Sequence, residues 1–256
     1  MKLIAHYTKL STLVNHILED SKFLMNILSN TKDPYEYKKR NAVVMSKMDL
    51  GKLLNNAPFI VSDVISSQIK IGCFVKEEGN LIKIQSLTSI TNSAMWAHYG
   101  DNSEGVILLF DLDELLKSCE SIIKDNWALV HREVQYDFEF TYRKNPASIL
   151  LDNCNDKSEL GIIKYVFEKC SDYWFYKRKE WSYENEYRIM LLSSQKGSVK
   201  INIKNSLKAI VFGEKVSSVM RNCLGNYCET NKIETISVEF DVNENKYKII
   251  PLSNIS

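Results

Sequence analysis

The sequence predicts a single α+β domain in which helices flank a split antiparallel or mixed β-sheet core. Short segments typical of strands recur from the start of the chain to its end, and segments with helical spacing lie between them. Only 4 Pro and 9 Gly punctuate the 256 residues, and neither a repeat nor a low-complexity stretch separates one part from another. We therefore expect residues 1–256 to form one domain.

Strands are predicted where apolar residues alternate with polar ones or form short runs. The run Val106–Phe110 is too short for a helix and is typical of a buried strand. Ser29–Pro34 is a strong loop signal, and Asn243–Asn245 predicts a hairpin between the last two strands. The predicted strands are Lys2–Thr8, Lys22–Ile27, Ile69–Lys76, Ile82–Leu87, Val106–Phe110, Val130–Asp137, Glu186–Leu192, Ala209–Phe212, Thr235–Phe240 and Lys246–Ile250.

Helices are predicted where apolar residues recur three or four positions apart. Ser11 is a candidate cap of the first helix. A helical insertion is expected at about residues 38–68, interrupted near Asn55–Pro58. Lys177–Lys179 is expected to be the solvated end of a helix, where the helix dipole favours cations; the alternative is contact with a phosphate group. The predicted helices are Leu10–Asp20, Arg40–Ser67, Leu112–Lys124 and Leu160–Lys177.

Composition limits the classes of function. The formal net charge is +1, so no overall field attracts nucleic acid or a membrane, although a local basic patch is compatible with this total. The six cysteines and four histidines show no metal-site spacing, so we expect reduced thiols and, unless distant ligands converge, no metal. The chain start lacks the apolar core of a signal peptide, and no apolar run approaches the roughly 18 residues that span a bilayer. We therefore expect a cytoplasmic protein without a membrane partner.

Two polar signatures, far apart in sequence, mark the candidate site. The first is His6-Tyr7-Thr8 on the first predicted strand, and the second is Trp181–Arg188, which leads into another strand. Because a strand alternates its faces with a period of two, Glu184 and Glu186 project to one side if this segment is extended. Two acids held together among aromatic residues are costly unless the protein uses them.

Each of these features also has a purely structural interpretation. A histidine on a first strand is often a hydrogen-bonded core residue, and the aromatic segment Trp96–Tyr99 is compatible with packing under a loop. Glu184, Glu186 and Arg188 occupy alternate positions, as on a solvated edge strand that carries a Glu–Arg pair. The functional interpretation therefore depends on the co-occurrence of the features in the right order.

Four stretches carry a resemblance to a known family. They are His6-Tyr7-Thr8, Thr31–Glu36, Met95–Tyr99 with its continuation through Glu104-Gly105 to Phe110-Asp111, and Trp181–Arg188. In this order they resemble a prokaryotic family of domains of unknown function that is often found near abortive-infection and phage-defence genes. One departure is visible, because Lys32 stands where the family usually has Asn before Asp-Pro, and a turn-capping role does not carry over to it.

The order of features also resembles the ADP-ribosyltransferase fold: a first-strand His, an early helix, a short second strand, central aromatic residues and a late Glu on a strand. The resemblance implies that NAD is the co-substrate. It also implies that His6 orients the nicotinamide ribose and that Glu186 is the catalytic Glu, which binds the ribose 2′-hydroxyl. Glu184 is similar to the first acid of the Glu-x-Glu pattern and is expected to act on the acceptor.

The aromatic residue that stacks on nicotinamide stays open in this comparison, since Tyr99, Trp96 and Tyr35 all qualify. The catalytic residues implied are Glu186, Glu184 and His6, and the NAD-contacting residues implied are His6, Tyr7, Thr8, Tyr35, Trp96, His98, Tyr99 and Arg188.

The chemistry of NAD cleavage is compatible with these residue types. Breaking the N-glycosidic bond builds positive charge on the ribose, which a carboxylate in a low-dielectric pocket stabilises. A histidine can hydrogen-bond ribose oxygens through its ring nitrogens, and an aromatic face attracts the cationic nicotinamide ring. A second acid can deprotonate or orient the acceptor nucleophile. If Lys177–Lys179 contact a phosphate instead of forming a solvated helix end, it is that of a nucleic acid or the NAD pyrophosphate.

These residues together favour an NAD-dependent ADP-ribosyltransferase acting on a macromolecular acceptor, either nucleic acid or protein. We expect a phage-defence or toxin–antitoxin effector, which implies a neutralising antitoxin or chaperone protein as partner. Two alternatives stay open. One is a metal-dependent nuclease or hydrolase that uses Glu184, Glu186 and His98. The other is a non-catalytic module that senses a phage or nucleotide ligand in the same cleft.

Overall fold

The computed structural model describes residues 2–30, 44–45, 67–78, 87–123, 127–136, 149–150, 153–156, 158–169, 174–193, 195 and 197–250. The strands are β1 Leu3–Thr8, β2 Lys22–Ile27, β3 Val44–Met45, β4 Ile69–Lys76, β5 Val106–Asp111, β6 Ala128–Glu133, β7 Gln135–Tyr136, β8 Ile149–Leu150, β9 Tyr176–Lys177, β10 Glu186–Leu192, β11 Val199–Asn202, β12 Leu207–Phe212, β13 Glu234–Asp241 and β14 Lys246–Ile250. The helices are α1 Leu10–Thr12, α5 Thr88–Thr91, α6 Ser93–His98, α7 Leu112–Glu120, α9 Glu159–Lys169 and α10 Ser218–Thr230, with a π-helix η1 Leu13–Leu18 and 3-10 helices η2 Leu28–Asn30, η4 Asp101–Ser103 and η7 Lys179–Glu184.

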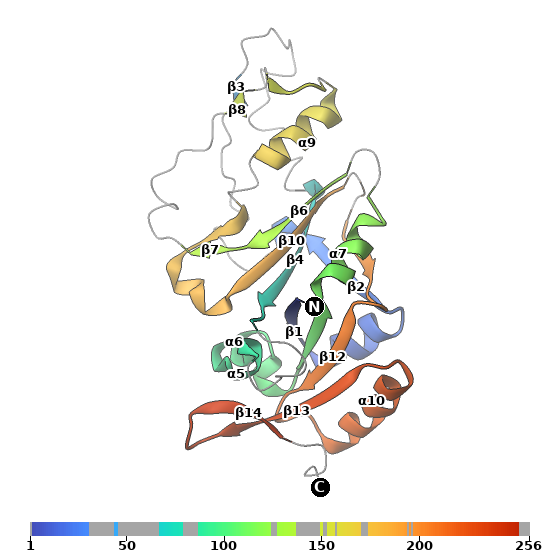
Figure 1. Cartoon of the computed structure of the whole chain (residues 1–256), viewed down its shortest axis with the longest axis vertical. Helices are drawn as coiled ribbons and strands as arrows, with labels where there is room; N and C mark the ends of the chain where they lie inside the picture. The colour runs from blue at the N-terminus through green and yellow to red at the C-terminus, as the bar shows by residue number, and fades with distance from the viewer. Residues whose placement is uncertain are drawn as a thin grey trace.

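The main sheet contains ten of the described strands and forks at β4 (Figure 1). Along one edge of β4, the residues from Ile69 to Val75 pair with the whole of β10. The other edge of β10 pairs with β6. Along the other edge β1 pairs only with Val75 and Lys76, and β2 pairs only with Lys70 and Ile71. The segment 72–74 therefore lies at a split between two arms of the sheet.

Each arm of the fork continues into further strands. One arm runs from β1 through β5, β12 and β13 to β14, and the other consists of β2 and β11. β12 and β13 are parallel and are joined by α10, whereas the other pairs of this sheet are antiparallel. The predicted α+β fold with a mixed sheet is thus confirmed, and the last two strands form the predicted antiparallel hairpin.

The run Val106–Phe110 shows how the sequence builds the core. All five side chains are buried, because β5 has a layer of helices and loops on each face. Leu108 and Phe110 join the cluster formed with η1, α7 and α10, whereas Ile107 and Leu109 join the cluster formed with α5, α6 and β14. A strand buried on both faces is expected to be apolar at every position, as this one is.

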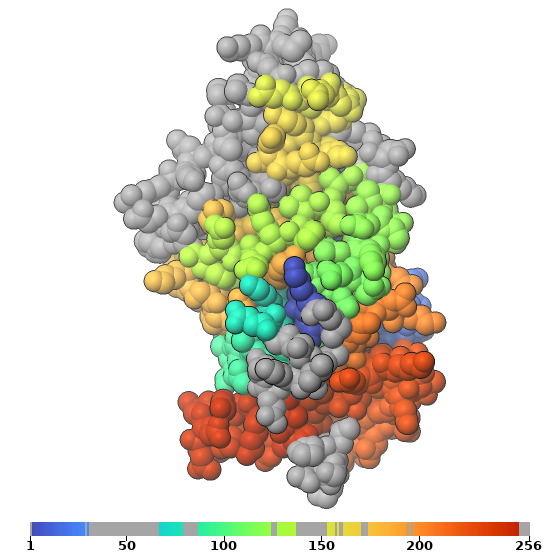
Figure 2. Space-filling model, viewed as in Figure 1, coloured from blue at the N-terminus to red at the C-terminus, as the bar shows by residue number. Residues whose placement is uncertain are grey.

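A third apolar cluster covers the other end of the sheet. There α9 packs through Ile163, Val166 and Phe167 against Met190 of β10 and Ile71 of β4. Figure 2 shows α9 near the upper end of the molecule and the C-terminal hairpin across its lower end. The two signatures of the sequence lie between these ends. His6-Tyr7-Thr8 is on β1, beside the split, and Trp181–Arg188 leads from η7 into β10, on the opposite edge of β4.

Most predicted elements are confirmed, with shifts at their ends. Leu10–Asp20 is helical but becomes a π-helix after α1, and Lys9 occupies the N-cap position, so Ser11 lies inside the helix and caps nothing. The strand predicted at Val130–Asp137 begins two residues earlier and is interrupted at Val134 before β7. β11 and α10 were not predicted.

Two further predictions differ from the structure or lie partly outside it. α9 ends at Lys169, and Lys177 belongs to the strand β9 instead of the solvated end of that helix. The helical insertion at 38–68 falls almost entirely outside the described residues, and within it Val44–Met45 form a strand that pairs with β8. Most of the strand predicted at Ile82–Leu87 also lies outside them.

Within the described residues, no helix has both the length and the apolar character needed to cross a membrane.

Candidate active site

A cavity of about 590 Å³ lies over the split in the sheet. Its size falls in the range of roughly 300–1,000 Å³ that is typical of small-molecule sites. β1, η1, β2 and β4 form most of its wall, and both polar signatures contribute to it. The lining residues are Ala5, His6, Tyr7, Thr8, Thr12, His16, Ile17, Lys22, Phe23, Leu24, Asn26, Ile27, Asn30, Ile71, Gly72, Cys73, Phe74, Val75, Met95, Tyr99, Lys177, Trp181, Glu184, Glu186 and Lys200.

His6 bridges the split. Its Nδ1 lies 2.8 Å from the backbone oxygen of Cys73, in the part of β4 that neither β1 nor β2 reaches. Since a carbonyl only accepts, Nδ1 carries the proton, and Nε2 is left as an acceptor in the neutral ring. Burial lowers the pKa of His6, and the hydrogen bond to Cys73 opposes this only in part. The edges of Phe23 and Phe74 hold the ring in place, with centroids 4.8 and 5.8 Å from it.

The two glutamates meet at the cavity, although not through an extended segment. Glu184 ends the 3-10 helix η7, Asn185 adopts a left-handed conformation with φ of 42°, and Glu186 begins β10. The strand therefore begins at Glu186 as predicted, and the extended segment on which the same-side argument for Glu184 and Glu186 depended is not present. The tight turn at Asn185 nevertheless places both carboxylates on the same cavity wall.

Lys177 joins the two carboxylates. Its Nζ lies 2.6 Å from Oε2 of Glu184 and 2.9 Å from Oε2 of Glu186. All three side chains are at most 7% exposed. Tyr99 completes the arrangement, because its hydroxyl donates to Oε1 of Glu184 at 2.6 Å. We call Lys177, Glu184, Glu186 and Tyr99 the carboxylate cluster.

Arg188 supports Glu186 from behind the cavity wall. Its Nε donates to Oε1 at 2.7 Å and its second terminal nitrogen donates to Oε2 at 2.9 Å, which is a bidentate pair. A further terminal nitrogen donates to the backbone oxygen of Trp174. Because β10 is a central strand, this Glu–Arg pair is buried, and the solvated edge-strand interpretation of the sequence is wrong.

The environment separates the pKa values of the two glutamates. Burial alone would raise the pKa of Glu186, but the charges of Arg188 and Lys177 outweigh it and hold this pKa far below its usual range. Burial raises the pKa of Glu184, and Lys177 offsets this only in part while the negative charge of Glu186 adds to it. Glu186 is therefore firmly ionised, whereas Glu184 takes up a proton more readily.

The aromatic residues of the cavity are Tyr7, Phe23, Phe74, Tyr99 and Trp181. Tyr35, one of the three candidates for nicotinamide stacking, is outside the described residues. Of the two that the structure describes, Tyr99 lies at the cavity and Trp96 does not. Trp181 was part of the second signature but received no role from the sequence. Its ring lies 5.5 Å from Nζ of Lys177, which places an aromatic face beside the carboxylate cluster.

Several predicted site residues are not part of the cavity wall. Trp96 is fully buried, donates from its indole nitrogen to the backbone oxygen of Ile90, and packs edge-on against Tyr7. His98 is exposed on α6 beside Tyr99. Arg188 reaches the site only through Glu186, as described above.

Tyr7 and Thr8, in contrast, do line the cavity, although both are largely buried. The hydroxyl of Tyr7 donates to the backbone oxygen of Ser89 and is thereby turned toward the protein core. All three residues of the His6-Tyr7-Thr8 signature therefore line the cavity, and His6 offers it a ring nitrogen.

The sequence did not predict His16, Lys22 or Lys200 at the site, and it considered Lys177 only as a phosphate contact, not as the partner of the two glutamates. Lys177 stands in a run of charged residues, which predicts exposure, and only the tertiary fold buries it between two glutamates. Lys22 and Lys200 belong to β2 and to β11, a strand that was not predicted, and a lysine on a half-exposed strand carries no local signal of function.

No group of three or more His, Cys, Asp or Glu side chains within the described residues is placed to hold a metal ion. The trio proposed for metal-dependent hydrolysis is not assembled, because His98 does not line the cavity. The ammonium group of Lys177 also lies between the two carboxylates, in the position that a cation would need.

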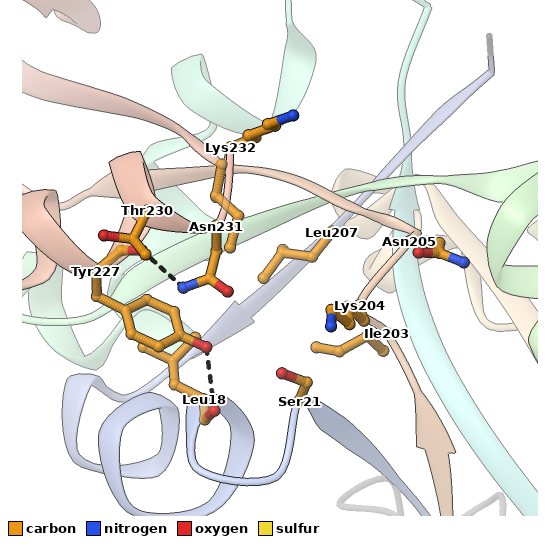
Figure 3. A pocket seen from close by; sticks show the side chains of 11 residues that line it. Leu18, Ser21, Ile203, Lys204, Asn205, Leu207, Tyr227, Thr230, Asn231 and Lys232 are labelled. Atoms are coloured by element: carbon orange, nitrogen blue, oxygen red, sulfur yellow. Dashed lines mark hydrogen bonds between the residues drawn. The ribbon is translucent and has the colours of Figure 1, made fainter.

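A second, smaller cavity of about 330 Å³ lies between the end of η1, the segment 203–207 that connects β11 to β12, and the end of α10 (Figure 3). Two of its prominent polar groups already serve the fold. The hydroxyl of Tyr227 donates to the backbone oxygen of Leu18. The side-chain amide of Asn231 donates to the backbone oxygen of Tyr227 (Figure 3). The described residues that line this cavity include neither a carboxylate nor a histidine, so the first cavity is the better candidate for chemistry.

The fold and the cavity define an α+β protein with a candidate active site at the split of its sheet. Residues 95–189 match the model of a family described as "Protein of unknown function (DUF2971)". This match covers less than half of the chain and includes the whole carboxylate cluster and Trp181, whereas His6, β2 and β11 lie outside it. It also contains the Met95–Asp111 and Trp181–Arg188 stretches on which the family resemblance was based. No curated protein and no solved structure gives a significant match.

Proposed function

We propose that the protein is an NAD-consuming ADP-ribosyltransferase whose active site is the cavity over the split. The observation that carries this proposal is the convergence of His6, Glu184 and Glu186 on one cavity. His6 lies on the first strand, Glu184 precedes β10 and Glu186 begins it, and these segments meet because β1 and β10 both pair with β4. A split sheet with a His on the first strand and a late Glu on another strand also agrees with the resemblance to the ADP-ribosyltransferase fold.

The separated pKa values assign different tasks to the two glutamates. NAD cleavage needs a fixed negative charge beside the ribose as the oxocarbenium-like cation forms, and Glu186, held ionised, supplies it. Transfer needs a base that takes a proton from the acceptor nucleophile, and a carboxyl group with a raised pKa suits that task better. Active sites commonly obtain an ionised carboxylate and a proton-transferring carboxyl group from two acids whose environments push their pKa values apart.

The remaining contacts are compatible with a bound nicotinamide nucleotide. With Nδ1 bonded to Cys73, His6 offers Nε2 as an acceptor for a ribose hydroxyl. Tyr99 and Trp181 lie beside the carboxylate cluster and offer aromatic faces for the cationic ring. Arg188 is a positioning residue in this proposal, because it fixes the carboxylate of Glu186 without lining the cavity.

The acceptor is a macromolecule, either nucleic acid or protein, and we place the reaction in the cytoplasm, where NAD is abundant. The biological role that we propose is that of a phage-defence or toxin–antitoxin effector, whose partner is a neutralising antitoxin or chaperone protein. The family resemblance of the sequence supports this role.

The experiment that tests the proposal uses NAD labelled on the adenylate. Purified protein is incubated with it alone and with total cellular RNA, DNA or protein, and each fraction is assayed for label. We expect label in one fraction with wild type and none with Glu186→Gln. Glu184→Gln should still release nicotinamide but transfer less label, because it lacks the base for the acceptor. Intact NAD in all mixtures, with no thermal stabilisation by NAD, would overturn the proposal and favour a sensor or another enzyme.

A further inference from the structure

The cavity over the split has two chemically different ends. At one end the carboxylate cluster contains both of the cavity's carboxylates, and these are paired with buried cations. At the other end η1, β2 and β11 contribute His16, Lys22 and Lys200. Among the described lining residues no carboxylate lies at this second end, which we call the lysine rim.

The register of β2 and β11 explains why the two lysines lie together. Leu24 of β2 lies opposite Lys200 of β11, and Lys22 lies opposite Asn202. Directly opposed residues of an antiparallel pair point to the same face, and so do residues two positions apart along one strand. Lys22 and Lys200 therefore project from one face of this two-stranded arm, which is the face that contributes Leu24 and Asn26 to the cavity.

The lysine rim carries an excess of positive charge. Asp20 is its neighbouring carboxylate, 3.0 Å from Nζ of Lys200 and 4.0 Å from Nζ of Lys22, and it does not line the cavity. One carboxylate shared by two ammonium groups leaves one positive charge uncompensated. All three side chains are about half exposed, so the ammonium groups can turn toward a ligand at little cost.

The sheet sets the distance between the two ends. β2 and β10 pair with opposite edges of β4, and β11 lies one strand further out than β2. Strands are spaced by about 4.8 Å, so a ligand that reaches from Glu186 to the lysine rim must span about 10 Å or more. This is the length of a nucleotide and exceeds that of a single sugar ring.

We propose that the lysine rim, Lys22 and Lys200, binds the pyrophosphate of the dinucleotide whose nicotinamide ribose lies at the carboxylate cluster. The assignment rests on the proposed function and adds to it the orientation of the substrate. Two lysines supply six N–H donors as point charges, which matches the doubly negative pyrophosphate. Asp20 competes with the ligand for the same ammonium groups.

The test measures binding by calorimetry with ADP, which carries a pyrophosphate, and with adenosine, which does not. We expect K22Q/K200Q to bind ADP about tenfold more weakly than wild type, since each exposed charge contact contributes up to about 1 kcal/mol, and to bind adenosine unchanged. Asp20→Asn should bind ADP more tightly, because it frees both lysines. K246Q/K248Q is the matched control, in which two exposed, ion-paired lysines of β14 are neutralised and ADP binding should stay at the wild-type level.

The outcomes separate this inference from the proposed function. Unchanged ADP binding in K22Q/K200Q, or an equal loss in K246Q/K248Q, overturns the inference. If wild type cleaves NAD and K22Q/K200Q keeps the same KM for NAD, the proposed function stands and the lysine rim has no part in it. Lysine-dependent ADP binding without any NAD cleavage supports the phosphate site and overturns the proposed function. Loss of RNA binding in K22Q/K200Q with unchanged ADP binding would assign the rim to the acceptor and overturn the inference.

Discussion

Replacing Lys177 with Met tests the physical core of the site. Its ammonium group is buried between Glu184 and Glu186, at 2.6 and 2.9 Å from their oxygens. At an effective dielectric constant of about 20, Coulomb's law gives each contact roughly 6 kcal/mol of gross attraction, most of which desolvation offsets. Removing one member of a buried ion pair leaves its partner uncompensated and typically costs about 3–5 kcal/mol. We therefore expect Lys177→Met to lower the free energy of unfolding by about 3–5 kcal/mol at neutral pH.

The pH dependence of this loss has a defined sign. Because the pKa of Glu184 is raised in the folded protein, the native state binds this proton more strongly than the unfolded chain does. This contribution to stability is present at low pH and is lost as the pH rises above the unfolded-state pKa. Lys177→Met removes an opposing charge and raises the pKa of Glu184 further. The variant should therefore be closest to wild type in mild acid and fall increasingly behind toward neutral pH.

Urea denaturation of wild type and Lys177→Met at several pH values measures both quantities. The double variant Lys177→Met/Glu184→Gln is the control. It also removes the carboxyl group of Glu184, whose pKa burial raises. We expect it to regain part of the lost stability at neutral pH and to lose most of the pH dependence. A loss below about 1 kcal/mol for Lys177→Met, or no recovery in the double variant, would refute the reasoning.

Three further predictions concern the framework of the site. Arg188→Lys should lower the free energy of unfolding by about 2–4 kcal/mol in urea, because an ammonium group cannot replace the bidentate pair with Glu186; wild-type stability would contradict this. His6→Leu should cost about 1–3 kcal/mol in the same assay, since the Cys73 carbonyl at the split loses its donor, and a neutral effect would show that His6 does not bridge the split. Gly105→Ala should lower the melting temperature, because the added Cβ would collide with the backbone oxygen of Thr8, and an unchanged melting temperature would contradict this close approach.

Local patterns were sufficient to predict the two strands beside the split, β1 and β2, and the strand β10 on the opposite edge of β4. The first strand, the second strand and the strand that contains Arg188 were predicted within a residue or two of their ends, because β-branched and apolar residues cluster there. α10 was missed even though Ser217 caps it and Leu224 and Cys228 face the core at helical spacing. The spacing of apolar residues by three or four positions, which predicted the other helices, also applies to this segment.

The geometry of the carboxylates could not be predicted from local sequence. Whether Glu184 lies on a strand or at the end of a 3-10 helix depends on the left-handed turn at Asn185, which many sequences with Asn do not make. The burial of Lys177 is a tertiary effect, since β9 pairs with β7 and this lysine reaches the cavity wall between the two glutamates. Sequence therefore located the two glutamates but not the cation that holds them together.

Nicotinamide release from NAD is the most direct measurement of the central claim, that Glu186 in the cavity stabilises the cation formed when the N-glycosidic bond breaks. Wild type, Glu186→Gln and the control Glu180→Gln are compared in the presence of a cell lysate as a source of acceptor. Glu180 is exposed, pairs with Arg178 and does not line the cavity. We predict release by wild type and Glu180→Gln, and a rate at least about 100-fold lower for Glu186→Gln. Release at the wild-type rate by Glu186→Gln, or no release by wild type, would contradict the claim.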